Sequence, residues 1–282
     1  MPVSIRSFVD ADLETAGTIL SLAFQRSGDW KTDLRLYRKI QPDGYFLAED
    51  HGIPVGMVGA VIYSAYAYVG LMAVHPESQR RGIGAALMQH VLTWLDGRGV
   101  PLVLLDASEA GQSLYEKLGF AAGEQVFILR RQDQGPVHSH SARTQNLSER
   151  DLDRIAVPDA AAFGADRGGV LRALLGAYPG RALLAQDGNG EVAGYIFAQK
   201  NRIGPWVMQD PACAEALLRS VLSLPFAGPI SAAVPGTNAR AIDLLQRHGF
   251  EKVRINLHMA RGSGAFPGQR EKVFAQASLS LG

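Results

Sequence analysis

The chain of 282 residues contains two copies of one pattern of strands and turns. In each copy two short apolar segments flank a polar turn. A strand that ends near a proline comes next, and a Gly-Phe pair comes after it, at similar distances in the two copies. The matched segments, first copy then second, are 46–50 and 183–187, 55–58 and 192–196, 74–76 and 209–211, and 118–120 and 248–250. Such an internal repeat predicts two units of one fold in tandem.

The most distinctive motif of the first copy is the segment 74–85, where a strand ends at a proline and an amphipathic helix begins. Gly82 and Gly84 open the helix, next to Arg80 and Arg81. Backbone amides in the first turn of a helix lack partners, and glycines let a diphosphate approach them without a Cβ in the way. The segment predicts a phosphate cradle, although an ordinary turn with solvated arginines would have the same glycines. Apolar residues then recur at helical spacing, at Leu87, Met88, Val91, Leu92 and Leu95.

A second motif follows a buried strand expected at 102–105. Tyr115 lies on a short helix that ends in Gly119, a suitable C-cap, and Phe120. Together with the Gln-x-x-Gly-x-Gly loop at 79–84, this Tyr-x-x-x-Gly-Phe ending resembles the GNAT superfamily of acyl-CoA-dependent N-acyltransferases, at the separation that the family uses. The resemblance implies an α/β fold with mixed sheets: two tandem GNAT-like domains, each a mostly antiparallel, splayed sheet flanked by helices.

The resemblance also implies roles for residues of the first copy. The amides of Met72 and Val74, on a strand splayed from its neighbour, would bind the pantetheine arm of acetyl-CoA and polarise the thioester carbonyl. Tyr115 would protonate the departing CoA thiolate, with a packing role and a hydroxyl hydrogen bond as the alternative. The family often has an asparagine shortly before that tyrosine, where this chain has Ser108, so one CoA contact is in doubt. The diphosphate would lie on Gln79, Arg80, Arg81, Gly82, Ile83, Gly84 and Ala85.

The second copy lacks these chemical groups. Its corresponding helix begins without glycines or arginines, and Glu215 in the first turn would repel a diphosphate. Alignment of the two Gly-Phe pairs puts Leu245 opposite Tyr115. The second unit is therefore expected to be a non-catalytic partner that helps to complete the acceptor site. The resemblance to bacterial tandem acetyltransferases with one active half spans nearly the whole chain.

The segment between the copies has no apolar periodicity and predicts a linker. We expect an acetyl-CoA-binding catalytic domain over residues 1–131, the linker over 132–144 and a degenerate GNAT-like domain over 145–282. His138 and His140 lie in the linker. Without a carboxylate or cysteine cluster nearby, a solvated segment is favoured over a metal site.

The composition argues against several classes of protein. The net charge is +1, from 28 Lys and Arg against 27 Asp and Glu, which argues against a nucleic-acid partner. With no apolar run long enough to span a membrane and no signal sequence, we expect no membrane contact and a cytoplasmic location. The single cysteine, Cys213, excludes a disulfide within the chain and a Cys-based zinc site, and is expected to be buried. No metal is expected, and the oligomeric state stays open.

The resemblance, together with the intact glycine loop and Tyr115, implies an N-acetyltransferase that moves an acetyl group from acetyl-CoA to a primary amine of a small molecule, by direct attack in a ternary complex. Two other functions stay open. One is a non-catalytic module that binds or senses acyl-CoA, and the other is a tandem aminoacyl or peptidoglycan-type transferase, which would not need the glycine loop. The identity of the amine is also open, because GNAT acceptor pockets are built from loops of low motif content.

The acceptor side offers fewer signals. An amine of pKa about 10.4 is mostly protonated at neutral pH, so a base must take its proton or the neutral form must be selected. The strand at 68–74 has no carboxylate, and Asp106 on the next strand is the candidate, with a helix N-cap as the alternative. Trp30 would either wall an acceptor pocket or pin its loop to the core. Asp166 and Arg167 would either reach the acceptor or form a surface ion pair.

Overall fold

The computed structural model describes residues 3–25, 30–132 and 144–282. Both halves of the chain run through the same order of elements, in agreement with the internal repeat. The first half forms β1 (Ser4–Ser7), α1 (Leu13–Ala23), α2 (Trp30–Ile40), β2 (Tyr45–Asp50), β3 (Ile53–Ile62), β4 (Ala67–Val74), α3 (Ile83–Asp96), β5 (Leu102–Ala107), α4 (Glu109–Lys117) and β6 (Ala121–Arg131). The second forms β7 (Thr144–Asn146), α5 (Leu152–Phe163), α6 (Gly168–Ala177), β8 (Ala182–Gln186), β9 (Val192–Ala198), β10 (Ile203–Met208), α7 (Ala214–Leu222), β11 (Ile230–Pro235), α8 (Ala239–Arg247), β12 (Glu251–Gly262) and β13 (Val273–Ala275).

Local geometry repeats between the halves as well. The expected hairpins are present as the antiparallel pairs β2–β3 and β8–β9. At both Gly-Phe pairs the glycine has positive φ, 86° at Gly119 and 81° at Gly249, a conformation that suits glycine at a helix end. The next amide then closes the helix on an equivalent carbonyl: Phe120 N donates to Tyr115 O at 3.0 Å, and Phe250 N donates to Leu245 O at 3.1 Å. These bonds confirm that Leu245 is the counterpart of Tyr115.

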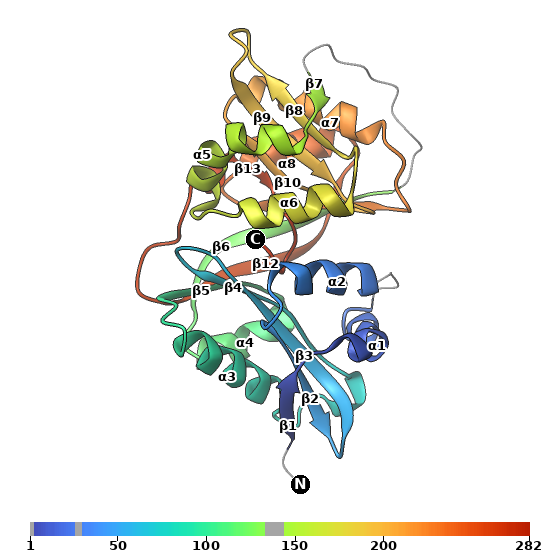
Figure 1. Cartoon of the computed structure of the whole chain (residues 1–282), viewed down its shortest axis with the longest axis vertical. Coiled ribbons are helices and arrows are strands. Elements are labelled where there is room, and N and C mark those ends of the chain that lie inside the picture. Colours follow the sequence, from blue (N-terminus) through green and yellow to red (C-terminus); the bar gives the residue numbers. More distant parts are fainter. Residues whose placement is uncertain (1–2, 26–29, 133–143) are drawn as a thin grey trace.

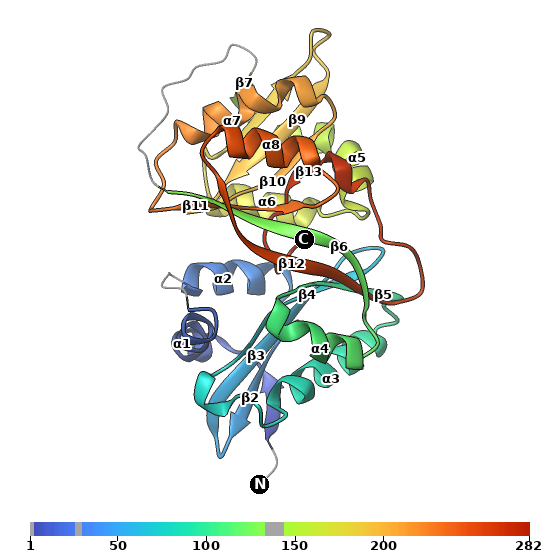
Figure 2. The same ribbon diagram turned by 180° about the vertical axis from the view of Figure 1, so that it is seen from behind.

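The two halves exchange strands. One sheet has the order β1-β2-β3-β4-β5-β12-β6-β11, and the other has the order β13-β10-β9-β8-β7. β12, from the second half, lies between β5 and β6 of the first and is antiparallel to both, while β6 pairs with β11 of the second half. Figure 1 and Figure 2 show these strands crossing the middle of the molecule. The domain boundaries at 131 and 145 remain a prediction, since strands of one sheet lie on both sides of them.

Helices cover both faces of the larger sheet. Apolar residues of α3 and α4 share one buried cluster with β2–β5 on one face, and α1 and α2 pack on the other face. That second cluster continues into the other half, where it includes Phe163, Leu171 and Leu281, and α2 packs against α6 (Figure 1). The fold class expected from the sequence is thus confirmed, with mostly antiparallel sheets flanked by helices. The halves share a continuous core in addition to the exchanged strands.

Several smaller expectations can be compared with the structure. Cys213 is buried, as expected from its apolar helix face. None of the helices described is long and apolar enough to cross a membrane. Within the described residues, no group of three His, Cys, Asp or Glu side chains could hold a metal ion. His138, His140 and most of the expected linker lie outside the described residues.

The strand exchange predicts that the halves fold together. A fragment of residues 1–134 lacks β12, so β5 and β6 would each expose an unpaired edge beside buried apolar side chains. We expect this fragment alone to aggregate or to show no cooperative thermal unfolding by circular dichroism. Co-expression with residues 143–282 should restore a one-to-one complex on size-exclusion chromatography. A monomeric fragment 1–134 that unfolds cooperatively would contradict the shared fold.

Candidate active site

β4 and β5 separate partway along their length. They are parallel neighbours, and their last pair is Val69 with Leu105. β4 then continues to Val74 without pairing to β5. Backbone groups on the facing edges of two separating strands have no strand partner, so they can bond to an extended ligand between them.

A bulge in β4 lies at the start of this separation. Opposite Met57 and Gly59 of β3 the register shifts, and Leu71 has a φ of 53°, a strained conformation for leucine. Further along, His75 N donates to Val55 O of β3 at 2.8 Å. Because successive strand amides point to opposite edges, the amides of Val74 and Met72 face away from β3, toward the separation.

The glycine loop lies at the end of β4 that carries Val74. Arg80 and Gly82 both have positive φ, at 59° and 80°, so the chain makes a tight reversal before α3 begins at Ile83. No side chain caps this helix, so the amides of its first turn, including Gly84 and Ala85, lack intrahelical partners. A Cβ on Gly84 would lie 3.0 Å from Met72 Cε, which shows how closely this turn approaches β4.

The polar side chains of the loop differ in their contacts. Gln79 folds back so that its Nε2 donates to Val74 O at 3.1 Å. Arg81, half-exposed, bonds through Nη2 to Asp50 Oδ2 on β2 at 2.7 Å. Arg80 is exposed. The loop therefore presents backbone amides and cationic side chains at one place, the chemistry expected of an anion site.

Tyr115 lies on α4, next to the end of β5. Its ring runs along Gly111, one turn earlier, where an added Cβ would lie 2.9 Å from Tyr115 Cε2 and 3.5 Å from the hydroxyl. The hydroxyl therefore points to the N-terminal end of α4, where β5 ends. Burial raises the pKa of Tyr115 to about 12, so the phenol keeps its proton at neutral pH.

Asp106 lies one residue beyond the last β4–β5 pair and is buried in a polar cluster. Its carboxylate accepts from Tyr68 Oη at 2.6 Å and from Gln276 Nε2 at 3.0 Å, and lies 2.8 Å from His258 Nδ1. Burial opposes its ionisation, but the hydrogen bonds from His258 and Tyr68 and the charge of Arg270 hold the pKa of Asp106 below its usual value. The N-cap interpretation of Asp106 is wrong, because Ser108 is the N-cap of α4.

His258 and Gln276 were missed by the sequence analysis. Both belong to the second half, His258 on β12 and Gln276 just after β13. Their contact with Asp106 depends on the strand exchange, which places His258 opposite Asp106 in the β12–β5 register. The available signal was a histidine between Leu257 and Met259 in a strand of mixed polarity, and it does not reveal a partner about 150 positions earlier.

In the second half, the corresponding separation is occupied by the chain itself. β10 and β11 correspond to β4 and β5 and share only an isolated parallel bridge, between Arg202 and Ser231. β13 lies against them instead: it pairs with β10, and Gln276 N just after it donates to Ala233 O of β11 at 2.8 Å. In the short helix η4 (Pro211–Cys213), which leads directly into α7, Ala212 N donates to Asp210 Oδ1 at 2.9 Å, so an anionic side chain already satisfies an amide there.

Asp166 and Arg167 do not form the surface ion pair that was the alternative for them. Arg167 is fully buried and pairs with Asp159, with Nη2 and Oδ1 2.8 Å apart. Its guanidinium also lies over the ring of Phe163 and donates through Nη1 to Gly282 O at 3.4 Å. Asp166 instead accepts from Gly168 N at 2.8 Å, at the start of α6.

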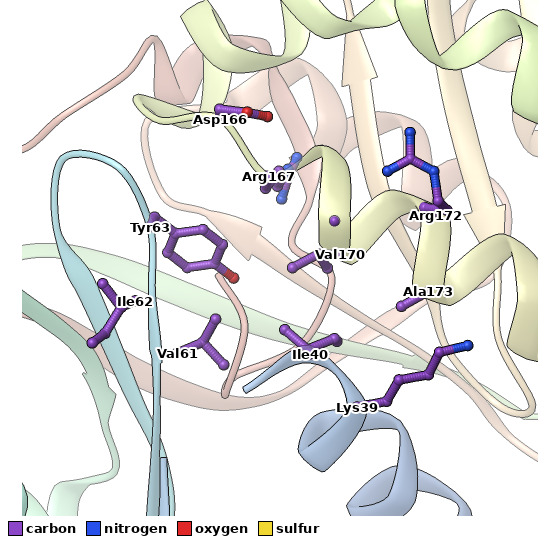
Figure 3. Close-up of a pocket in the computed structure, with 11 residues that line it drawn as sticks. Lys39, Ile40, Val61, Ile62, Tyr63, Asp166, Arg167, Val170, Arg172 and Ala173 are labelled. Atoms are coloured by element: carbon purple, nitrogen blue, oxygen red, sulfur yellow. The ribbon is translucent and has the colours of Figure 1, made fainter. Parts of the chain in front are cut away.

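Both residues line a cavity of about 300 Å³ between the halves. Figure 3 shows Ile40, Val61 and Tyr63 of the first half facing Val170 of α6 across it. Tyr63 Oη donates to Leu281 O at 2.6 Å, and the adjoining Gly282 packs on Tyr68. A continuous set of contacts thus leads from this cavity to the carboxylate of Asp106.

Trp30 is the first residue of α2 and only 9% exposed. It packs in the core shared by the two halves, with its ring centroid 5.8 Å from that of Phe24. Residues 26–29 before it lie outside the described residues. A substrate contact by Trp30 stays a prediction.

Two family models match the chain. Residues 14–120 match the Acetyltransferase (GNAT) family, and residues 155–275 match an Acetyltransferase (GNAT) domain. The two matches cover the two halves, each of which has the order of elements described above. The chain belongs to the GNAT acetyltransferases and consists of two such units in tandem.

Three known proteins are similar to this chain over different shares of its length. A solved structure from Pyrococcus horikoshii, described as a candidate acetyltransferase, has 26% identity and a TM-score of 0.88 over 99% of this chain and 96% of that one. The Uncharacterized N-acetyltransferase YitH of Bacillus subtilis is 26% identical over 70% of this chain and 71% of its own length. Mycothiol acetyltransferase of Streptomyces coelicolor is 29% identical over 45% of this chain, and the match spans 46% of that relative.

The difference between the two strand separations predicts one CoA site per chain. Gly84→Asp would place a carboxylate among the phosphates and should abolish CoA binding in calorimetry. Gly176→Asp is a matched control, because Gly176 is an exposed helical glycine with nothing within 4 Å of an added Cβ.

Thermal unfolding should first show that Gly84→Asp is folded. Two CoA sites per chain in the wild type, or unchanged affinity in Gly84→Asp, would contradict a single site in the first half.

Proposed function

We propose that the first half transfers an acetyl group from acetyl-CoA to a primary amine by direct attack in a ternary complex. The observation that carries this proposal is the separation of β4 from β5 beside the uncapped first turn of α3. The same separation in the second half is filled by β13. The first half therefore offers an open strand edge and an anion site in one line, which suits a ligand with an amide-containing arm and a diphosphate.

The donor would lie along this line. Its diphosphate would contact the amides of residues 82–85, and its pantetheine arm would bond to β4 as an added strand does. The amides of Met72 and Val74, which face the separation, would then meet the arm and the thioester carbonyl. A backbone amide aimed at that carbonyl stabilises the negative charge that develops on its oxygen during attack.

Tyr115 would act on the leaving sulfur. Its pKa of about 12 keeps a proton on the phenol, available for donation. Since an ordinary thiol has a pKa of about 8.5, below that of this phenol, the free-energy gain comes from the hydrogen bond that the phenol donates to the developing thiolate. Leu245 offers no such group in the second half.

The acceptor would approach from the face of the sheet that the second half covers. Asp106 points to this face, since Leu104 two positions earlier belongs to the core shared by the halves. Relatives of this chain are named for both small-molecule and protein acceptors, mycothiol acetyltransferase and ribosomal protein bS18-alanine N-acetyltransferase. The cavity between the halves favours a small molecule.

Release of CoA in the presence of acetyl-CoA and a panel of primary amines tests the proposal. The panel should include amino acids, polyamines, amine-bearing antibiotics and N-terminal peptides, with the acetylated product identified by mass spectrometry. CoA binding without turnover on any amine would instead favour a sensing module. Transfer from an aminoacyl-tRNA would favour the aminoacyl-type transferase.

Tyr115→Phe should lower kcat by about 10² to 10⁴, the usual contribution of a general acid. The affinity for CoA should change little, because the ring and its packing against Phe120 are kept. Steady-state kinetics with the amine found in the panel, together with calorimetry, would measure both quantities. An unaltered kcat would remove Tyr115 from the mechanism.

A further inference from the structure

Three buried side chains of the second half surround Asp106, and each leaves one polar atom unpartnered. Asn256 Nδ2 donates to the Asp106 carbonyl at 3.2 Å, while His258 and Gln276 bond to the carboxylate. Their remaining polar atoms, Asn256 Oδ1, His258 Nε2 and Gln276 Oε1, are buried without a hydrogen-bond partner. All three residues are at most 4% exposed.

Such a concentration of unsatisfied atoms requires an explanation. A buried polar atom without a partner destabilises the fold, and native structures contain few of them. Here three occur on side chains that bond to one residue, Asp106, and none is forced by the strand pairing, because each belongs to a side chain. A polar ligand or a water that bonds these atoms during function accounts for their retention.

The cluster lies where the proposed reaction occurs. Asp106 directly follows the last β4–β5 pair, and Tyr68 of β4 bonds to its carboxylate, so the carboxylate lies at the start of the strand separation. The cluster faces the second half, and α3 with the anion site lies on the opposite face. An amine that entered from the second half would meet the cluster before the thioester.

We propose that His258 is the base of the acetyl transfer and that the second half thereby supplies a catalytic residue to the first. This inference rests on the proposed function. Asp106, held ionised, accepts the Nδ1 proton of His258, which fixes the tautomer with an unprotonated Nε2. Nε2 is the atom left without a partner, so its lone pair is available to a proton donor.

With His258 as the base, the acetyl-transfer step balances in protons and electrons. The lone pair of the neutral amine forms the C–N bond at the thioester carbon, and Nε2 of His258 takes a proton from that nitrogen. The C–S bond breaks, its electron pair leaves on sulfur, and the thiolate accepts a hydrogen bond from Tyr115. Exchange with water then removes the proton from His258.

The groups around the imidazole are consistent with this role. The carboxylate of Asp106 on β5 faces Nδ1, and Tyr68 on β4 lies against the ring at 6.0 Å between centroids. Arg270, in the short helix η5 (Arg270–Lys272), is bonded to Glu124 of β6. Phe266 covers the imidazole at 5.2 Å between ring centroids and is itself 36% exposed.

Two substitutions in the full-length chain separate the base from the scaffold. His258→Asn puts an amide donor where Nδ1 was, so the bond to Asp106 can form while Nε2 is lost. Asp106→Asn keeps the shape but reverses the tautomer preference, which places the proton on Nε2. Each should lower kcat at neutral pH by about 10² to 10⁴ while acetyl-CoA affinity in calorimetry stays within threefold.

Two readouts distinguish a base from a structural histidine. If His258 is the base, the plot of kcat/KM against pH should lose its acidic limb in His258→Asn. The pH dependence that remains should be that of the amine substrate alone. Imidazole in the buffer should restore part of kcat in His258→Asn and none in Asp106→Asn or Tyr115→Phe. His248→Asn is the matched control, since His248 lies in the second half and bonds to Glu215 at 3.1 Å.

The outcomes separate this inference from the proposed function. Wild-type kinetics in either variant, with its pH profile intact, would overturn the role of His258 and leave the acetyltransferase proposal standing. Loss of kcat without imidazole rescue and with an unchanged pH profile would also overturn it and make the cluster structural. If the wild type transfers acetyl to no amine, the function and the inference fail together. If one variant unfolds on thermal analysis, the other decides.

Discussion

The insertion of β12 between β5 and β6 is the constraint on which the rest of the structure depends. A single backbone ladder joins strands from both ends of the chain, so the relative position of the halves is fixed by hydrogen bonds as well as by apolar contacts. It also determines which residues meet at the start of the β4–β5 separation. A side chain about 150 positions away becomes a direct neighbour of Asp106 through one register pair.

The two halves show how one fold can leave a strand separation open or fill it with its own chain. In the first, β4 bends at Leu71 and separates from β5, and a glycine-opened helix follows. In the second, the equivalent strand edge is satisfied by β13, and Asp210 satisfies an amide near the start of α7. The physical requirement is the same in both cases, because exposed strand edges and helix amides need hydrogen-bond partners. One half can satisfy it with a ligand and the other satisfies it with its own chain.

The sequence was informative where function depends on local backbone geometry. The glycines at 82 and 84 and the Gly-Phe pairs predicted the helix start, the C-caps and the correspondence of Tyr115 with Leu245. Prediction failed where contacts are long-range. Local pattern offered a surface ion pair as one role for Arg167, which is in fact buried against Asp159. It also offered an N-cap role for Asp106, which instead bonds to β4, β12 and the segment after β13. Periodicity reports the face on which a residue lies and cannot report which distant strand becomes its neighbour.

β13 gives the second half the equivalent of a ligand that never dissociates. A free cofactor stabilises the protein that binds it in proportion to the logarithm of its concentration, whereas a covalently attached strand acts at a constant effective concentration. The contribution of β13 to stability therefore does not depend on the concentration of any ligand. Because β12 couples the halves, that constant contribution also supports the first half when its own site is empty.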